Sequence, residues 1–109
     1  MKTVWKITLD TYDGVEQKIE LPEGAKFLNV EKAVTIGALK YPRFDLWFLV
    51  DTAARPEQRS IRITGTGEDL DSGESLELLI HDYLGTVVVN GGLVLHFWDN
   101  GTETLEEPE

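Results

Sequence analysis

Hydrophobic and polar residues alternate along much of this chain with a period of two, which is typical of half-buried β-strands. Residues 5–9 read Trp-Lys-Ile-Thr-Leu, and residues 15–21 follow the same alternation with one mismatch. Asp13 and Gly14 lie between these two segments and favour a turn. We therefore expect the first two strands to pair with each other as a hairpin.

The middle of the chain predicts three further strands. Residues 26–34 alternate so that Leu28 and Val30 would face inward. Residues 46–50 are apolar at every position, which is typical of a central strand covered on both faces. Residues 60–64 alternate again, and a Gly-Thr-Gly sequence follows them and ends the strand.

The clearest local signal is a hairpin near the C-terminus. Two segments rich in β-branched and aromatic residues flank Asn90 and Gly91, which can both take the positive φ that a type I′ turn requires. With this hairpin the chain has about seven short strands separated by turn residues. This pattern predicts an all-β fold, either an antiparallel β-sandwich or a sandwich-like small barrel.

Composition and length favour one soluble domain. The chain has 109 residues, of which 41% are hydrophobic, and this is enough for a single core. It has no cysteine, so it can form neither a disulfide nor a thiolate metal site. We see no signal peptide and no apolar run long enough to span a membrane, so we expect a cytoplasmic protein without a membrane partner.

The charge is strongly and unevenly acidic. The net charge is −10, from 20 acidic and 10 basic residues, and five of the acids but none of the bases lie in residues 99–109. We expect residues 1–98 to form the β domain and residues 99–109 to be an acidic, disordered tail. A second run, residues 68–82, holds six acids and no Lys or Arg. Such a chain is repelled by phosphate backbones, so we expect no direct binding to nucleic acid.

Two groups of charged residues are the candidate binding residues: the arginines Arg55, Arg59 and Arg62, and the acids Glu68, Asp69, Asp71, Glu74 and Glu77. Arginine binds phosphate or carboxylate through a bidentate fork, so the first group is the natural anion site. The alternative, which we favour, is that these arginines form ion pairs within an acidic protein. The acids have oxygen ligands suited to calcium, but their spacing is not that of an EF-hand loop. A solvated acidic loop is the preferred interpretation.

The sequence gives no indication of an enzyme. There is no Gly-x-Ser-x-Gly sequence, and His81 and His96 lie far apart with no evident nucleophile beside either. His96 lies in a predicted strand, where we expect a hydrogen-bonded sheet histidine. We therefore expect no catalytic residues, no cofactor and no metal site.

Five blocks follow one another in the chain: residues 21–30 (LPEGAKFLNV), 46–51 (LWFLVD), 59–67 (RSIRITGTG), 83–86 (YLGT) and 93–98 (LVLHFW). In this order they resemble a family of small uncharacterised proteins encoded mainly by bacteriophages and prophages. The resemblance covers nearly the whole chain, although residues 68–80 look enlarged and the acidic tail looks added. The family has no assigned function, so the resemblance implies a phage setting and no mechanism.

In a phage setting, an acidic non-catalytic protein is expected to bind a host protein, as in host takeover or anti-defence. One alternative is sequestration of a small anionic ligand such as a nucleotide signal, held by the three arginines, His96 and a tryptophan. Another alternative is a minor structural component of the virion. An exposed sheet edge would also allow homo-oligomerisation. The bacterial host cytoplasm is the expected location.

Overall fold

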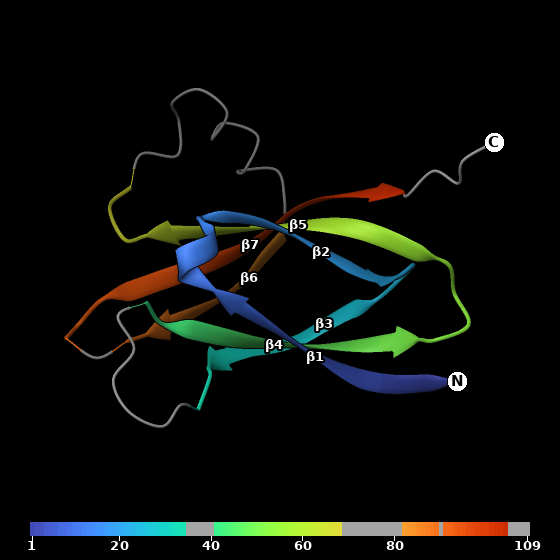
Figure 1. The fold of residues 1–109 in the computed structure, drawn as a ribbon. Helices are drawn as coiled ribbons and strands as arrows, with labels where there is room; N and C mark the ends of the chain where they lie inside the picture. The colour runs from blue at the N-terminus through green and yellow to red at the C-terminus, as the bar shows by residue number, and fades with distance from the viewer. Residues whose placement is uncertain (35–40, 69–81, 90, 105–109) are drawn as a thin grey trace.

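Two antiparallel β-sheets pack face to face in the computed structural model of the chain, which describes residues 1–34, 41–68, 82–89 and 91–104 (Figure 1). The three-stranded sheet has the order β1 (Lys2–Asp10), β4 (Arg43–Asp51), β3 (Lys26–Lys32). The four-stranded sheet has the order β2 (Glu16–Pro22), β5 (Pro56–Gly65), β7 (Val94–Thr104), β6 (Asp82–Val88). The predicted antiparallel sandwich is confirmed, and the described strands do not close into a barrel.

The core lies between the two sheets because alternate residues of each strand face inward. Every second residue of β4 from Phe44 to Val50 is buried, and Ile61 and Ile63 of β5 face them from the other sheet. The rings of Phe44 and Phe97 meet edge to face across the sandwich, with their centroids 4.9 Å apart. These apolar inner faces hold the two sheets together.

The predicted pairing of the first two strands is wrong. β1 pairs with β4, and β2 pairs with β5 in the other sheet. A short 3₁₀ helix, η1 (Thr11–Asp13), follows β1, and Gly14 after it has φ +107°. This turn carries the chain from one sheet to the other. Alternation shows that both segments are strands, but it does not show which strand each one pairs with.

The expected burial of β3 and β4 is only partly correct. A register shift between Phe27 and Asn29 interrupts the alternation of β3, so Leu28 is 47% exposed while Val30 is buried. β4 is the central strand, as predicted, but its outer face is only partly covered, since Asp45 on that face is buried and Trp47 is partly exposed. Leu49 points to the outer face and is 39% exposed.

The predicted C-terminal hairpin is present between β6 and β7, and its loop is one residue longer than a two-residue turn. The Val89 N–H donates to the Leu93 carbonyl at 2.7 Å, and the Gly92 N–H donates to the Val89 carbonyl at 3.2 Å. Gly91 and Gly92 have φ of +90° and +85°, which other residues rarely adopt. The conformation of Asn90 lies outside the described residues.

Strand β7 continues to Thr104, so the boundary after residue 98 that the sequence suggested does not coincide with the end of a strand. The first residues of the acidic segment therefore pair with β5 in the four-stranded sheet. Residues 105–109 lie outside the described part of the chain.

Candidate functional site

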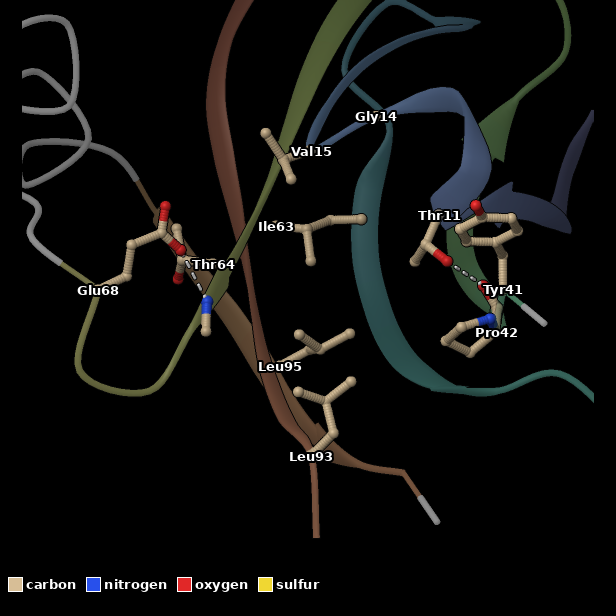
Figure 2. Close-up of a pocket in the computed structure, with 11 residues that line it drawn as sticks. Thr11, Gly14, Val15, Tyr41, Pro42, Ile63, Thr64, Glu68, Leu93 and Leu95 are labelled. Atoms are coloured by element: carbon tan, nitrogen blue, oxygen red, sulfur yellow. Dashed lines mark hydrogen bonds between the residues drawn. The ribbon is translucent and has the colours of Figure 1, made fainter. Parts of the chain in front are cut away.

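A cavity of about 340 Å³ opens at one end of the sandwich (Figure 2). We call it the end cavity. It lies where β1 leads into β2, where β4 begins, where β5 ends and where β7 begins. Its lining residues are Thr11, Gly14, Val15, Tyr41, Pro42, Ile63, Thr64, Gly65, Glu68, Leu93 and Leu95. Its volume falls in the range of about 300–1,000 Å³ found for small-ligand pockets.

The lining of the end cavity is mainly apolar. Ile63 of β5 and Leu95 of β7 point into it from the four-stranded sheet, and they belong to or pack against the core (Figure 2). Val15 and Leu93 line it as well, and they are 54% and 51% exposed. Because exposed apolar side chains border the cavity, an apolar group from outside would gain contact area by entering it.

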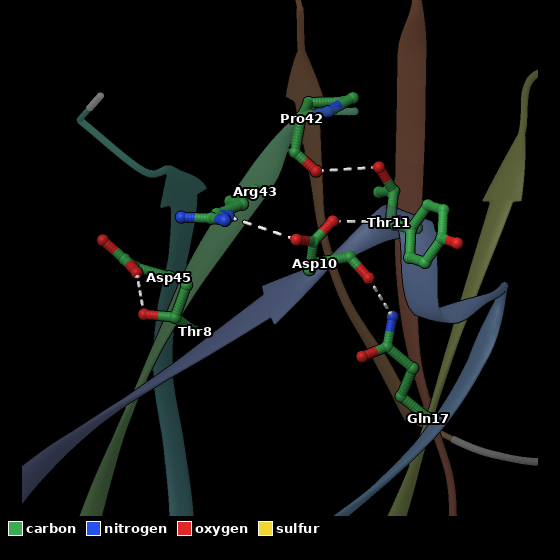
Figure 3. A network of polar contacts seen from close by, with 8 residues as sticks. Thr8, Asp10, Thr11, Gln17, Pro42, Arg43 and Asp45 are labelled. Atoms are coloured by element: carbon green, nitrogen blue, oxygen red, sulfur yellow. Dashed lines mark hydrogen bonds and ion pairs between the residues drawn. The ribbon is translucent and has the colours of Figure 1, made fainter. Parts of the chain in front are cut away.

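Polar contacts fix one wall of the end cavity to the start of β4. The Thr11 backbone N–H and hydroxyl both donate to the Pro42 carbonyl, at 3.2 and 2.8 Å (Figure 3). The Gln17 side-chain amide donates to the carbonyls of Asp10 and Gly14, at 2.8 and 2.9 Å. The turn between β1 and β2 is therefore fixed by Pro42 before β4 and by Gln17 of β2.

Asp10 does not line the cavity, but its side chain stabilises the turn that does. Its carboxylate accepts the Tyr12 N–H at 2.9 Å, which caps η1, and it accepts Arg43 Nε at 3.2 Å (Figure 3). The Tyr12 N–H and the Arg43 guanidinium hold the pKa of Asp10 below its ordinary value. The Tyr12 ring meets the Tyr41 ring edge to face, with centroids 5.2 Å apart. These contacts fix the turn that contributes Thr11 and Gly14 to the cavity.

One carboxylate lines the end cavity. Glu68 lines it, and one of its oxygens accepts the Gly65 N–H at 2.9 Å. Asp13 is exposed on η1, next to the lining residue Gly14. Glu68 is therefore the one charged side chain among the described lining residues.

Of the predicted arginines, Arg55 and Arg62 form ion pairs on the surface. Arg55 Nε lies 2.9 Å from Glu23, and Arg62 lies 3.2 Å from Glu16 on the neighbouring strand β2. Glu16 also accepts the Ser60 hydroxyl at 2.9 Å, and this bond is the main cause of the lowered pKa of Glu16. Both guanidinium groups therefore already have carboxylate partners.

Arg59 lies inside the sandwich, with its side chain 8% exposed. It forms a hydrogen-bonded ion pair with Glu57 at 3.1 Å, and its Nε lies 3.5 Å from Asp99 without a hydrogen bond. Its guanidinium lies over the Phe48 ring, 5.7 Å from the centroid. The structure does not bring the three arginines together into one anion site, and it matches the ion-pair interpretation.

The other candidate residues from the sequence are His96, which forms hydrogen bonds within the sheet, and the acids of residues 68–77. His96 is a hydrogen-bonded sheet histidine, as expected, since Nε2 is 2.8 Å from the Thr66 hydroxyl and Nδ1 is 2.9 Å from the Thr86 hydroxyl. Of the predicted acids, only Glu68 is described. The structure does not describe Asp69, Asp71, Glu74 and Glu77, so their role stays a prediction.

Sequence reasoning missed the end cavity entirely. Its lining residues come from two strands, β5 and β7, from η1 and from the segments that connect the strands. No local pattern indicates that Val15 and Leu93 would lie at the same cavity. The only local signal for the cavity is that a hydrophobic residue directly precedes β2 and another directly precedes β7.

The described residues offer neither a metal site nor a membrane span. Among residues 1–34, 41–68, 82–89 and 91–104, no three His, Asp or Glu side chains are grouped so that they could bind a metal ion. The same residues contain no helix with the length and hydropathy needed to cross a bilayer.

The fold and the end cavity define a small, all-β sandwich protein with a preformed apolar pocket between its sheets. Within this class, the chain belongs to the family described as a domain of unknown function, DUF7352, which matches residues 1–107. The match agrees with the resemblance to a family without an assigned function. No curated protein and no solved structure matched the chain.

Proposed function

We propose that this chain is a non-catalytic binding protein that acts on a partner protein. In this proposal the end cavity receives one apolar side chain of the partner. The observation that supports it most is the preformed apolar cavity, with Ile63 and Leu95 inside and the half-exposed Val15 and Leu93 beside them. A cavity of this size accommodates a side chain or a small ligand, whereas a flat sheet face offers no such anchor point.

The charge around the cavity favours a basic partner. Glu68 lines the cavity, and in the sequence two further acids, Asp69 and Asp71, lie within three residues after it. Carboxylates around an apolar pocket attract Lys and Arg side chains that flank an apolar anchor, and they increase the rate of association. The partner would therefore present an exposed leucine or aromatic residue among basic residues.

The resemblance to phage and prophage proteins sets the context of this proposal. A phage protein of this kind would bind a basic host protein, in host takeover or in blocking a defence. The bacterial cytoplasm is the compartment where such a contact would form. Assembly into the virion is the alternative role, and proteomic analysis of purified particles would reveal it.

Sequestration of a small anion has less support. It would use Arg55, Arg59 and Arg62, but each of these has a carboxylate partner, and Arg59 faces the core. An anionic ligand would have to displace those carboxylates. A thermal-shift measurement with a panel of cyclic nucleotides separates the two functions, because a tight ligand raises the melting temperature.

Fluorescence anisotropy with labelled peptides tests the main proposal. The peptides carry one leucine, phenylalanine or alanine at the centre, flanked by lysine or by glutamate. We expect the lysine-flanked leucine and phenylalanine peptides to bind, and salt to weaken the binding. Replacing the central leucine by alanine should remove about 1.5–3 kcal/mol, which is about 10- to 150-fold in affinity.

Val15→Trp places a bulky ring at the cavity, and Val88→Trp is the matched control on the outer face of β6. Both valines are exposed, at 54% and 66%, so both variants should fold. We expect Val15→Trp to weaken peptide binding and Val88→Trp to leave it unchanged. Equal binding of all peptides, or equal effects of the two tryptophans, would contradict the proposal.

A further inference from the structure

Strand β1 is an edge of the three-stranded sheet and pairs only with β4. The pairing extends beyond both strand ends, because the Thr52 N–H donates to the Met1 carbonyl and the Thr11 N–H donates to the Pro42 carbonyl. Antiparallel partners alternate between hydrogen-bonded and non-hydrogen-bonded pairs. The odd-numbered residues of β1 therefore bond to β4, and the even-numbered residues direct their N–H and C=O groups away from it.

Four residues of β1 thus carry unpaired backbone groups along the edge: Lys2, Val4, Lys6 and Thr8. Within the described ranges, none of these N–H or C=O groups has a backbone partner outside β4. The next even-numbered residue, Asp10, is covered, because the Gln17 side chain donates to its carbonyl at 2.8 Å. The open edge therefore ends after Thr8, and we call residues 2–8 the open edge.

The side chains of the open edge are basic on one face and apolar on the other. Lys2, Val4 and Lys6 point to the outer face, where Val4 is 53% exposed. Trp5 and Ile7 point toward the inner face, and Trp5 is still 37% exposed. An added strand would cover Trp5 with alternate side chains and would place the others beside the two lysines.

The lysines of the open edge have no ion-pair partner among the described residues. Asp51, the register partner of Lys2, forms its ion pair with the Met1 amino group at 3.5 Å. The Ala53 N–H is the main cause of the lowered pKa of Asp51, and Lys2 contributes least to it. Asp45 is buried and accepts the Thr8 hydroxyl at 2.6 Å. Within a chain of net charge −10, Lys2 and Lys6 form a local positive site.

We propose that the open edge binds an extended acidic segment of a partner protein as an additional antiparallel strand. Its acidic side chains would lie beside Lys2 and Lys6, and its alternate apolar side chains would cover Trp5. Backbone hydrogen bonds to the even-numbered residues would provide the affinity, as in other cases of strand addition. This proposal does not depend on the end cavity.

Charge also distinguishes this partner from a second copy of the chain. Antiparallel pairing of two open edges would bring four lysine side chains to one face, and like charges on facing strands destabilise a pair. Lysine on an edge strand is a common device against self-association. An acidic segment, in contrast, would be attracted by the positive charges of Lys2 and Lys6.

The test uses a seven-residue peptide that alternates glutamate and valine, with both ends blocked. Control peptides replace glutamate by lysine or place all glutamates before the valines. Amide hydrogen exchange followed by NMR should show slower exchange at Val4 and Lys6 when the alternating peptide is added. Exchange at Trp5 should not change, because its N–H already bonds to β4.

Lys6→Glu should weaken the binding of the acidic peptide by about fivefold or more, because attraction becomes repulsion. Lys32→Glu, at the end of the opposite edge strand β3, changes the net charge equally and should have no effect. Val4→Pro removes one outward N–H and should also abolish binding, since an edge strand tolerates proline on its solvent side. If Val4→Pro does not fold, the comparison of Lys6→Glu with Lys32→Glu tests the proposal.

Three results would overturn the proposal: no protection at Val4 and Lys6, equal effects of Lys6→Glu and Lys32→Glu, or a dimer of the free chain whose Val4 and Lys6 amides are already protected. Val15→Trp, which blocks the end cavity, should leave binding of the acidic peptide unchanged. The failure of one proposal is therefore distinguishable from the failure of the other.

Discussion

Replacing Arg59 by methionine should destabilise the fold, because this arginine neutralises carboxylates inside the sandwich. Its side chain is 8% exposed and forms the ion pair with Glu57 at 3.1 Å. Asp99 lies 3.5 Å away, and the guanidinium also covers the Phe48 ring. Methionine keeps much of the aliphatic length but has no charge, so two carboxylates would lose their cation.

The size of the effect follows from how little water reaches these carboxylates. The side chains of Glu57 and Asp99 are 10% and 17% exposed, so water cannot replace the guanidinium fully. Removing one partner of a buried ion pair costs about 3–5 kcal/mol. We expect Arg59→Met to lower the free energy of unfolding by about 3 kcal/mol, a large part of the roughly 5–15 kcal/mol of a typical domain. Adding Glu57→Gln should restore part of this loss.

Urea unfolding followed by tryptophan fluorescence measures the change, and the m-value shows whether the transition stays two-state. Arg55→Met is the matched control. It removes the same charge from an ion pair whose side chains are 63% and 53% exposed. Exposed pairs contribute about 0–1 kcal/mol, so this variant should remain close to the parent protein.

Similar losses for Arg59→Met and Arg55→Met would refute this reasoning. A loss below about 1 kcal/mol for Arg59→Met would do the same, since it would mean that the two carboxylates do not need the guanidinium. Arg59 would then be available for an external anion, as the alternative interpretation of the sequence requires.

Three further predictions concern the packing and the acid sensitivity of the fold. The double-mutant cycle of Phe44→Leu and Phe97→Leu should show a coupling of about 0.5–1.5 kcal/mol in urea unfolding, and additive losses would contradict the edge-to-face contact. A Cβ at Gly85 would lie 3.1 Å from Val30 Cγ1, so Gly85→Ala should cost about 1–3 kcal/mol, and Val30→Ala in the same chain should relieve the clash. The pKa of Asp10 is lowered in the folded state, so its contribution to stability is complete above the unfolded pKa of about 3.9 and is lost as the pH falls through the folded pKa. Asp10→Asn should therefore make the stability less sensitive to pH in this acidic range, and urea midpoints measured across it would show no such change if the contacts of Asp10 were unimportant.

The strands themselves could be predicted because their signals are local. Alternation and turn residues indicated the all-β class, the closing hairpin and the central position of β4. The partner of β1 could not be predicted, since it begins only at Arg43, on the far side of two other strands. The prediction that Leu28 faces inward was wrong, because one register shift in β3 exchanges the two faces of the strand.

For the charged residues, the sequence predicted two alternative roles and could not decide between them. The sequence identified Arg59 as either an anion-binding or an ion-pairing residue. Its partner Asp99 lies in β7, which approaches β5 only in the folded sheet. The end cavity was beyond prediction for the same reason, because its residues are distant in the chain and become neighbours through the topology.

The order of strands in the two sheets has a consequence for how the chain folds in time. The first, third and fourth strands form one sheet, and the second pairs with the fifth in the other, so the chain crosses between layers before either sheet is complete. During synthesis β1 leaves the ribosome long before β4, and β2 before β5. Folding therefore depends on contacts between distant segments, which places it in the slower class of β proteins that fold in about milliseconds to seconds. β1 therefore remains without its partner until β4 is made, and β2 until β5 is made.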